Sequence, residues 1–108
     1  MTKWVMVVTT NCTDATRKAE FNEWYNKIHL PDILETPGFT RATRYENIEP
    51  LEGEARFLAI YDIEADDIDE VMKTHDENMV RKRAEGRFSE LVVRVSRNVY
   101  RQVSSFSK

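Results

Sequence analysis

The sequence predicts a single α+β domain with the element order β-α-β-β-α-β, which is the order of the ferredoxin-like fold. Three observations carry this prediction. Four segments have the β-branched or alternating apolar pattern of strands, and two segments without Gly or Pro place apolar residues at helical spacing. All six follow one another within 108 residues, a length typical of one domain, so residues 1–108 are treated as one unit. We expect a four-stranded antiparallel sheet with both helices on one face.

The first strand and the first helix come from the N-terminal part of the chain. The apolar run within Lys3–Thr9 predicts the strand. Thr13 or Asp14 can cap the helix that follows, whose apolar residues form one stripe: Phe21, Trp24, Tyr25 and Ile28. Because proline disfavours helical backbone at the residue before it, Pro31 predicts that this helix ends near Ile28 or His29.

The remaining elements follow a turn that Pro37-Gly38 predicts. Three more strands are expected, over Phe39–Asn47, Ala55–Ile63 and Leu91–Val103. On the first of these, alternation places three residues on one face: Phe39, Thr43 and Tyr45. The second helix begins at Asp66 or Asp67 and ends before Gly86, and its apolar stripe is Ile68, Val71, Met72, His75 and Met79.

The strand at Ala55–Ile63 is apolar on both faces, because Phe57, Ala59 and Tyr61 alternate with Leu58 and Ile60. If both helices cover one face of the sheet, the other face is exposed in a monomer. An apolar sheet face of this kind needs a cover. We therefore predict a homodimer in which the open faces of two sheets pack together.

Composition and charge exclude several classes of function. A net charge of −3 removes the electrostatic basis for nucleic-acid binding. The longest apolar run, Val5 to Val8, is far shorter than a membrane span, and the single cysteine, Cys12, cannot form an internal disulfide. The residues after Met1 lack the apolar stretch of a signal peptide. We expect a cytoplasmic protein with no nucleic-acid and no membrane partner.

One segment is more informative than the rest. The aromatic pair Trp24-Tyr25 is followed by His-x-Pro at His29, and Pro37-Gly38-Phe39 then leads into a strand that carries Arg44-Tyr45. This pattern resembles the EthD-like families of the dimeric α+β barrel superfamily. The resemblance implies a dimeric α+β barrel with a cleft between the helices and the sheet of each subunit. Enzymes of the superfamily bind small aromatic or polyketide-like molecules there, often with a histidine acting on them.

His29 is the leading catalytic candidate. It lies one helical turn after Tyr25, and an imidazole, with an ordinary pKa of about 6.5, exchanges protons near neutral pH. The structural alternative is that its ring caps the helix by binding a free carbonyl before Pro31. The His-x-Pro resemblance favours catalysis, with Tyr25 and Tyr61 stabilising an enolate-like oxygen. Core packing is the alternative role of each tyrosine.

Four further residues are predicted to bind substrate in the cleft: Trp24, Asp32, Tyr45 and His75. For His75, on the apolar stripe of the second helix, a buried structural histidine is the alternative. Asp32 either orients His29 or caps a short turn. Arg41 and Arg44 lie on opposite faces of one predicted strand, so at most one of them can hold a carboxylate in the cleft. Two histidines without a cysteine pair or a carboxylate at ligand spacing predict no metal site.

These residues predict a cofactor-independent general acid–base enzyme acting on a small carbonyl, aromatic or polyketide-like molecule. It would be a cyclase, isomerase or lyase in which His29 moves the proton. Two alternatives stay open. One is a non-catalytic small-molecule binding or accessory protein. The other is a cofactor-free monooxygenase or haem-handling member of the same superfamily, in which His29 or His75 is available as a haem ligand.

Overall fold

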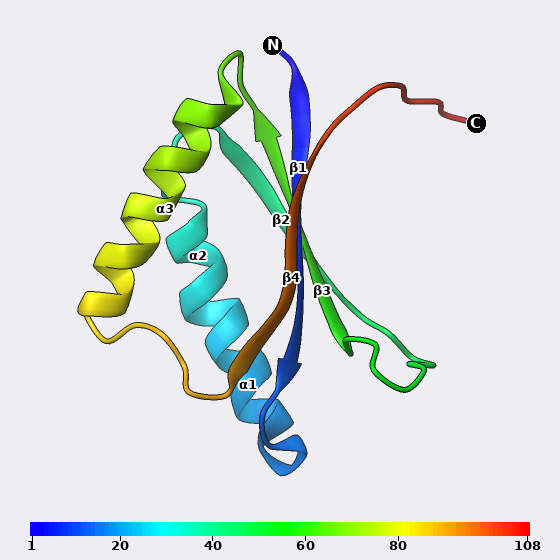
Figure 1. The fold of residues 1–108 in the computed structure, drawn as a ribbon, viewed down its shortest axis with the longest axis vertical. Helices are drawn as coiled ribbons and strands as arrows, with labels where there is room; N and C mark the ends of the chain where they lie inside the picture. Colours follow the sequence, from blue (N-terminus) through cyan, green and yellow to red (C-terminus); the bar gives the residue numbers. More distant parts are fainter.

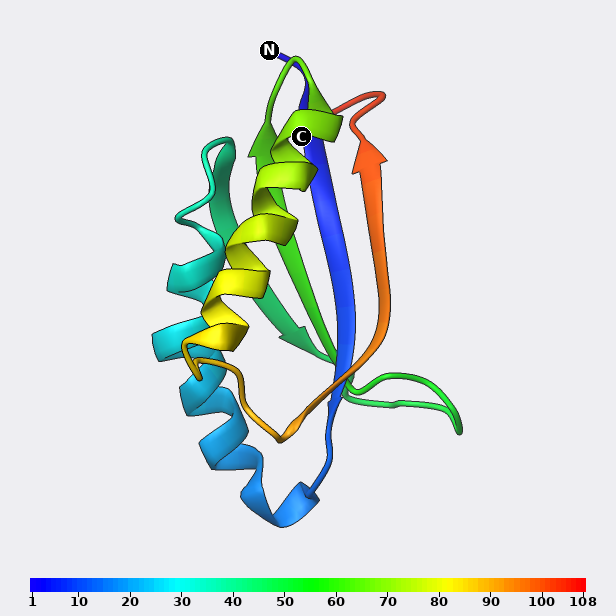
Figure 2. The same ribbon diagram turned by 60° about the vertical axis from the view of Figure 1, so that its left-hand side comes forward.

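The structure, a computed structural model that describes residues 1–108, contains one antiparallel sheet with strand order β2-β3-β1-β4. The strands are β1 (Lys3–Cys12), β2 (Phe39–Glu46), β3 (Phe57–Glu64) and β4 (Val92–Arg101). All three strand pairs are antiparallel, and the helices lie on one side of the sheet (Figures 1 and 2). The predicted ferredoxin-like α+β fold is confirmed.

The first helical region consists of four short pieces that follow one another. A 3₁₀ turn (Ala15–Arg17) precedes α1 (Lys18–Trp24), a π-helical turn (Tyr25–His29) and α2 (Leu30–Ile33). Asp14 begins the region, because its carboxylate accepts a hydrogen bond of 3.0 Å from the backbone N–H of Thr16. The second region is the single helix α3 (Ile68–Ala84), which Asp67 caps in the same way.

The prediction that the first helix ends near Ile28 or His29 is wrong. Leu30 keeps helical backbone angles (φ −60°, ψ −47°), and its N–H bonds to the carbonyl of Tyr25, five residues back. Pro31 lies in the first turn of α2, which is the part of a helix that best tolerates a proline. The helix therefore continues through the proline, and residues five apart in the turn lie on the same side.

The structure decides which face of β3 the helices cover. Phe57, Ala59, Tyr61 and Ile63 are all buried beneath the helices, whereas Leu58 and Ile60 are half-buried on the open face. The main core cluster joins this inner face to β1 and α2: Met6, Val8, Ile33, Phe39, Ala59, Tyr61, Ile63 and Ala65. A second cluster of Phe21, Tyr25, Phe57 and Leu91 closes the end of the layer near α1.

The predicted common face of Phe39, Thr43 and Tyr45 is wrong because β2 contains a bulge. The register with β3 shifts between Phe39 and Arg41, so that Phe39 stays buried while the residues after the shift change sides. Tyr45 pairs with Leu58 on the open face and is 55% exposed. Arg44 instead pairs with Ala59 and points to the helix side.

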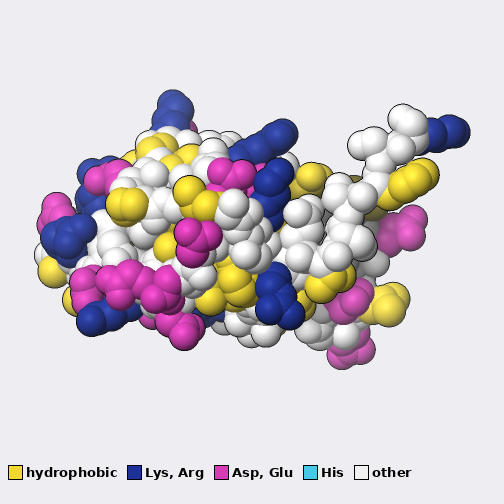
Figure 3. Space-filling view, turned by 90° about the horizontal axis from the view of Figure 1, so that it is seen from above, with side chains coloured by type: hydrophobic (Ala, Val, Ile, Leu, Met, Phe, Trp, Pro, Cys, Tyr) yellow, Lys and Arg dark blue, Asp and Glu magenta, His cyan; other side chains and the backbone are white.

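The surface of the molecule is charged and mixed. Seen from above, acidic and basic side chains alternate over the helical side, and the C-terminal residues extend away from the body of the domain (Figure 3). No helix of the structure has the length and hydrophobicity needed to cross a membrane.

Candidate functional site

A cavity of about 920 Å³ lies between the helices and the sheet. Its floor is the inner face of the two central strands, with Met6, Val8, Thr10 and Tyr61. One wall comes from the first helical region, with Trp24, Tyr25, His29 and Ile33, and the opposite wall from α3, with His75, Met79 and Arg83. The segment before β4 and that strand itself complete the cavity with Phe88, Ser89, Val92, Arg94 and Arg97.

His29 lies in the cavity wall within a box of three aromatic rings. Its imidazole stacks on Trp24, with ring centroids 4.6 Å apart and planes 18° apart. The rings of Tyr25 and Phe88 make T-shaped contacts with it, at 5.0 and 5.4 Å between ring centroids. The π-helical turn explains the stacking, because it brings Trp24 and His29, five residues apart, onto one side of the helix.

The His29 ring is neutral at pH 7. Burial lowers its pKa to about 4; the charge of Asp32 opposes this shift, and the smaller effects of His75 and Arg44 add to it. Neither ring nitrogen hydrogen-bonds another residue, so the ring does not cap the helix. A neutral imidazole with both nitrogens uncommitted can accept a proton from a molecule in the cavity.

Two tyrosine hydroxyls belong to the same cavity. Tyr25 and Tyr61 are almost completely buried, and burial raises the pKa of each above its ordinary value, so both are neutral hydrogen-bond donors. The Tyr25 hydroxyl lies near those of Tyr61 and Thr10. The Tyr61 hydroxyl has no hydrogen-bond partner of ordinary geometry. A buried hydroxyl without a partner of good geometry is uncommon in a folded protein, and it can bind a ligand oxygen only where the cavity floor opens to it.

His75 shares the cavity from the opposite wall. Its ring is 3% exposed and stacks on Phe39, with centroids 5.1 Å apart. Burial lowers the pKa of His75 to about 4, Arg97 adds to the shift, and Asp76 opposes it. Its Nδ1 atom is buried without a hydrogen-bond partner. The two histidines of the chain therefore line one cavity, both in the neutral form.

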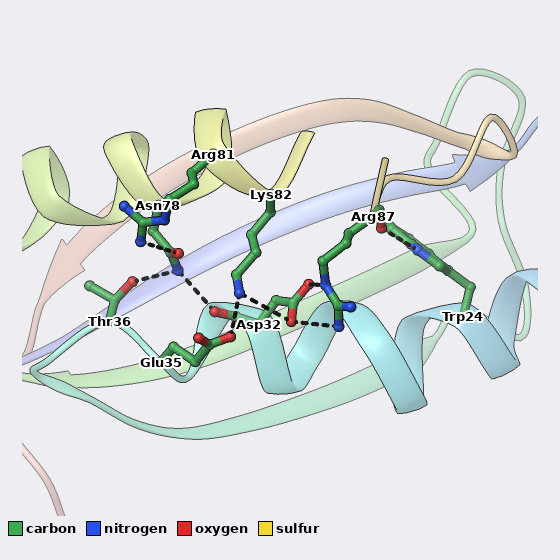
Figure 4. A network of polar contacts seen from close by, with 8 residues as sticks. All are labelled: Trp24, Asp32, Glu35, Thr36, Asn78, Arg81, Lys82 and Arg87. Carbon is green, nitrogen blue, oxygen red and sulfur yellow. Dashed lines mark hydrogen bonds and ion pairs between the residues drawn. The ribbon is translucent and has the colours of Figure 1, made fainter. Parts of the chain in front are cut away.

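Asp32 lies behind the cavity and does not bond to His29. Its carboxylate, 4% exposed as a residue, accepts two hydrogen bonds from the guanidinium of Arg87, at 2.7 and 3.0 Å (Figure 4). The backbone carbonyl of Arg87 accepts a hydrogen bond of 2.9 Å from Nε1 of Trp24. Arg87 thus connects the segment between α3 and β4 to Asp32 of α2 and to Trp24, the ring that stacks on His29.

The same carboxylate also joins α2 to α3 (Figure 4). Lys82 lies 3.9 Å from Asp32 and 2.8 Å from Glu35, and Asn78 donates a 2.9 Å hydrogen bond to the backbone carbonyl of Asp32. Burial alone would raise the pKa of Asp32. The hydrogen bonds and charge of Arg87, with the charge of Lys82, outweigh it and hold that pKa below its usual value.

The structure brings together most of the predicted site residues. Five of them line the cavity: Trp24, Tyr25, His29, Tyr61 and His75. Asp32 supports the wall from behind, and Tyr45 lies on the opposite face of the sheet, so its predicted place in the cleft is wrong. Phe88 and three arginines of the lining were not predicted. The one sequence signal for the arginines was the interruption of the Val-rich last strand by Arg94 and Arg97.

Sequence comparison assigns the chain to a family. Residues 4–102 match the family described as Domain of unknown function (DUF4286). The chain belongs to this family. None of the curated proteins matches it at a significant level. The DUF4286 family thus gives the chain a relationship without an assigned activity.

Solved structures share the fold of this DUF4286 chain. HapK from Hahella chejuensis has a TM-score of 0.73 at 11% identity, with 97% of each chain covered. The haem-degrader MhuD from Mycobacterium tuberculosis, with two haems bound in its active site, has a TM-score of 0.64 at 16% identity, covering 96% of this chain and 99% of MhuD. SnoaB, a cofactor-independent oxygenase from Streptomyces nogalater, has a TM-score of 0.62 at 14% identity, with 100% of each chain covered. At such identities the likeness shows the fold alone.

Two more structures bear on the predicted resemblance. An EthD family protein from Bacillus halodurans has a TM-score of 0.61 at 17% identity, covering 95% of this chain and 100% of its own. A dimeric ferredoxin-like protein from Thermobifida fusca has a TM-score of 0.56 at 10% identity, covering 94% and 90%. The resemblance to EthD-like proteins is confirmed at the level of the fold class, within which they are one group among several.

The histidines of the cavity do not fit haem ligation. A histidine that binds a metal through one ring nitrogen almost always donates its other N–H to a carboxylate, carbonyl or water, which fixes the ring. No residue accepts a hydrogen bond from either nitrogen of His29, and Nδ1 of His75 is buried without a partner. The one carboxylate near His29, that of Asp32, is bound by Arg87. Neither histidine therefore has the protein partner that orients a haem ligand.

Tyr61→Phe is expected to raise the free energy of unfolding by about 1 kcal/mol, because it keeps the buried ring and removes a hydroxyl that has no partner. Urea unfolding measures the change. Tyr25→Phe is the matched control, since its hydroxyl has a contact with Thr10 and is not among the unpartnered buried atoms, and it should not stabilise the protein. A Tyr61→Phe protein that unfolds more easily than the wild type would contradict this reading of the hydroxyl.

Arg87→Gln is expected to lower the urea midpoint at least roughly twice as much as Arg17→Gln. Both arginines make two hydrogen bonds to one carboxylate, and Arg17 makes a third to Glu90, but Asp32 is buried whereas both partners of Arg17, Glu20 and Glu90, are exposed. Folding lowers the pKa of Asp32 from 3.8, so the ionised Asp32–Arg87 pair stabilises the folded protein at neutral pH. This stabilisation is lost when the pH falls below 3.8 and through the lowered pKa. Equal midpoints for the two variants at pH 7 would refute the special role of this pair.

Proposed function

We propose that the protein is a cofactor-independent enzyme that moves a proton in a small carbonyl, aromatic or polyketide-like molecule bound in the cavity. The observation that carries the proposal is the neutral, uncommitted imidazole of His29, held by three aromatic rings in a cavity that also contains the unpaired hydroxyl of Tyr61. The aromatic walls suit a flat apolar substrate. The polar groups supply a base and hydrogen-bond donors.

The chemistry follows from those groups. His29 takes the proton from a C–H bond that is next to a carbonyl or conjugated with it through an aromatic ring, and the electron pair of that bond moves onto the carbonyl oxygen as an enolate. The hydroxyls of Tyr61 and Tyr25 donate hydrogen bonds to this oxygen as its charge develops. Return of the proton to another carbon gives an isomerisation, and attack of the enolate carbon on a second carbonyl gives a cyclisation.

A second candidate uses the same first step. An enolate of an electron-rich aromatic ketone transfers electrons to dioxygen directly, which makes the enzyme a cofactor-free oxygenase. The likeness of the whole chain to SnoaB, described as a cofactor-independent oxygenase, supports this candidate. The third possibility is a protein that binds its ligand without catalysis. In that case no C–H bond of the ligand is broken in the cavity.

The test uses anthrone, a tricyclic aromatic ketone with an acidic C–H opposite its carbonyl. Without oxygen, the wild-type protein should speed exchange of that hydrogen for deuterium, followed by NMR, and His29→Gln should lose about 10²-fold or more of the effect. In air, consumption of one O₂ with formation of anthraquinone and water identifies the oxygenase. His75→Gln is the matched variant, with a smaller loss expected. Exchange by the wild type no faster than in buffer, with anthrone bound, favours the binding protein.

The pH dependence of the exchange gives an independent check. His29 acts in its neutral form, which predominates above its pKa of about 4. The value of kcat/KM should therefore stay level between about pH 6 and 8 and fall as acid protonates the ring. A rise in activity as the pH falls through this range would show that the imidazolium, not the imidazole, is the active form.

We also propose that the protein is a homodimer that joins the open faces of two sheets. Leu58 and Ile60 of β3 are half-buried in one chain, and Tyr45 of β2 and Tyr100 of β4 are more than half exposed. A stable pair buries about 800 Å² on each partner, which a sheet face of this size can provide. The Thermobifida fusca protein of the same fold, described as dimeric, supports the proposal.

Ile60→Asp is expected to convert the dimer to a monomer of 12.7 kDa in sedimentation experiments, because it places a charge in the centre of the proposed interface. Leu34→Asp is the control, since Leu34 is exposed at the end of α2 on the opposite side of the domain. A wild-type protein that sediments as a monomer at micromolar concentration would refute the proposal, as would an Ile60→Asp protein that remains dimeric.

A further inference from the structure

The lining of the cavity is more positive than the protein as a whole. Three arginines line it, Arg83, Arg94 and Arg97, against a single acidic residue, Asp76. The whole chain has the opposite sign, with a net charge of −3. Charges of one sign in a cleft with apolar walls focus the electric field there and attract ligands of the opposite sign.

The three arginines are not equally engaged. Arg97 forms an ion pair of 2.8 Å with Asp76, which joins β4 to α3 beside the cavity. Arg83 lies over the ring of Phe88, with 4.3 Å from its guanidinium carbon to the ring centroid, and has no carboxylate partner. Arg94 forms no ion pair either. By contrast Arg87, the arginine bound to Asp32, is outside the lining. Two guanidinium groups at the cavity are therefore free to bind an anion.

The stacking of Arg83 also links this charge to the aromatic box. Arg83 lies over the ring of Phe88, and this ring makes a T-shaped contact with His29, at 5.4 Å between ring centroids. A ligand that reaches from the guanidinium groups toward His29 thus passes along an aromatic wall. The cavity lining also includes Tyr61 and His75, each of which has a buried polar atom without a hydrogen-bond partner.

We propose that the natural ligand is an amphiphilic anion, with a flat apolar body in the cavity and a carboxylate, phosphate or sulfate group bound by Arg83 and Arg94. The inference rests on the proposed function, because it names the substrate class of that same cavity. Guanidinium groups suit this task, since their planar fork of N–H donors matches the oxygens of such anions. The proposed function allows carbonyl, aromatic and polyketide-like compounds. The arginines favour those compounds that carry an acidic group at one end.

The test compares binding of naphthalene derivatives that differ in one substituent: 2-naphthoate, 2-naphthyl phosphate, 2-naphthamide and 2-naphthylmethylamine. Titration calorimetry with the wild-type protein should give at least about tenfold tighter binding of an anion than of the neutral amide, and the cation should bind most weakly. The tighter of the two anions shows whether the group is a carboxylate or a phosphate. Equal affinities for naphthoate, naphthyl phosphate and naphthamide overturn the proposal.

Variants show whether the arginines are responsible. Arg83→Gln with Arg94→Gln should remove the preference for the anions while leaving the affinity for naphthamide within about twofold. Arg101→Gln is the matched control, an exposed arginine of β4 that is not part of the cavity lining, and it should keep the preference. Loss of the preference in Arg101→Gln to the same extent would also overturn the proposal.

The outcome is separate from that of the proposed function. His29→Gln should retain the preference for anions, because the guanidinium groups and not the imidazole bind the charged end. If anions bind no better than the amide while His29→Gln abolishes proton exchange, the catalytic proposal stands and the ligand class is wrong. If anions bind more tightly than the amide but the wild-type protein does not speed proton exchange, the protein binds amphiphilic anions without catalysis.

Discussion

The shape of the cavity depends on one buried carboxylate. Asp32 lies where α2, α3 and the segment before β4 meet, and a charge removed from water must be paired and hydrogen-bonded. Arg87 and Lys82 provide the opposite charges, and Asn78 binds the Asp32 backbone. Because Arg87 also accepts the indole N–H of Trp24, the pairing that solvates Asp32 fixes the ring on which His29 stacks. The requirement to satisfy a buried charge therefore also positions the candidate base.

The fold and much of the cavity could be predicted from the sequence because both depend on periodic patterns. Alternation along β3 identified the two candidate faces, and the helical stripes carrying Tyr25 and His75 placed both residues over the sheet. The Trp24-Tyr25 and His29-x-Pro31 pattern pointed to the correct wall. The spacing of apolar residues is a local property of the sequence, so it predicts strands and helices without knowledge of which segments are in contact in the folded protein.

The errors arose where one extra residue changes the period. A bulge in β2 transferred Tyr45 to the open face, and a π-helical turn carried the first helix past Pro31. Both depend on hydrogen bonds that no single residue signals. The arginine lining and the Asp32–Arg87 pair join residues far apart in sequence, so only the tertiary structure reveals them. The π-helical turn is also what stacks Trp24 on His29, an example of local irregularity at a candidate functional site.

The position of β1 between β3 and β4 has a consequence for how the protein is made. The first strand pairs with the last, so one edge of β1 lacks its partner until residues as far as Arg101 have been synthesised. Until then the sheet has only β2, β3 and β1, and an unpaired strand edge of this kind is prone to associate with other chains. The wall that carries Arg94 and Arg97 is also missing. The cavity is therefore completed only when β4, the last strand of the chain, pairs with β1.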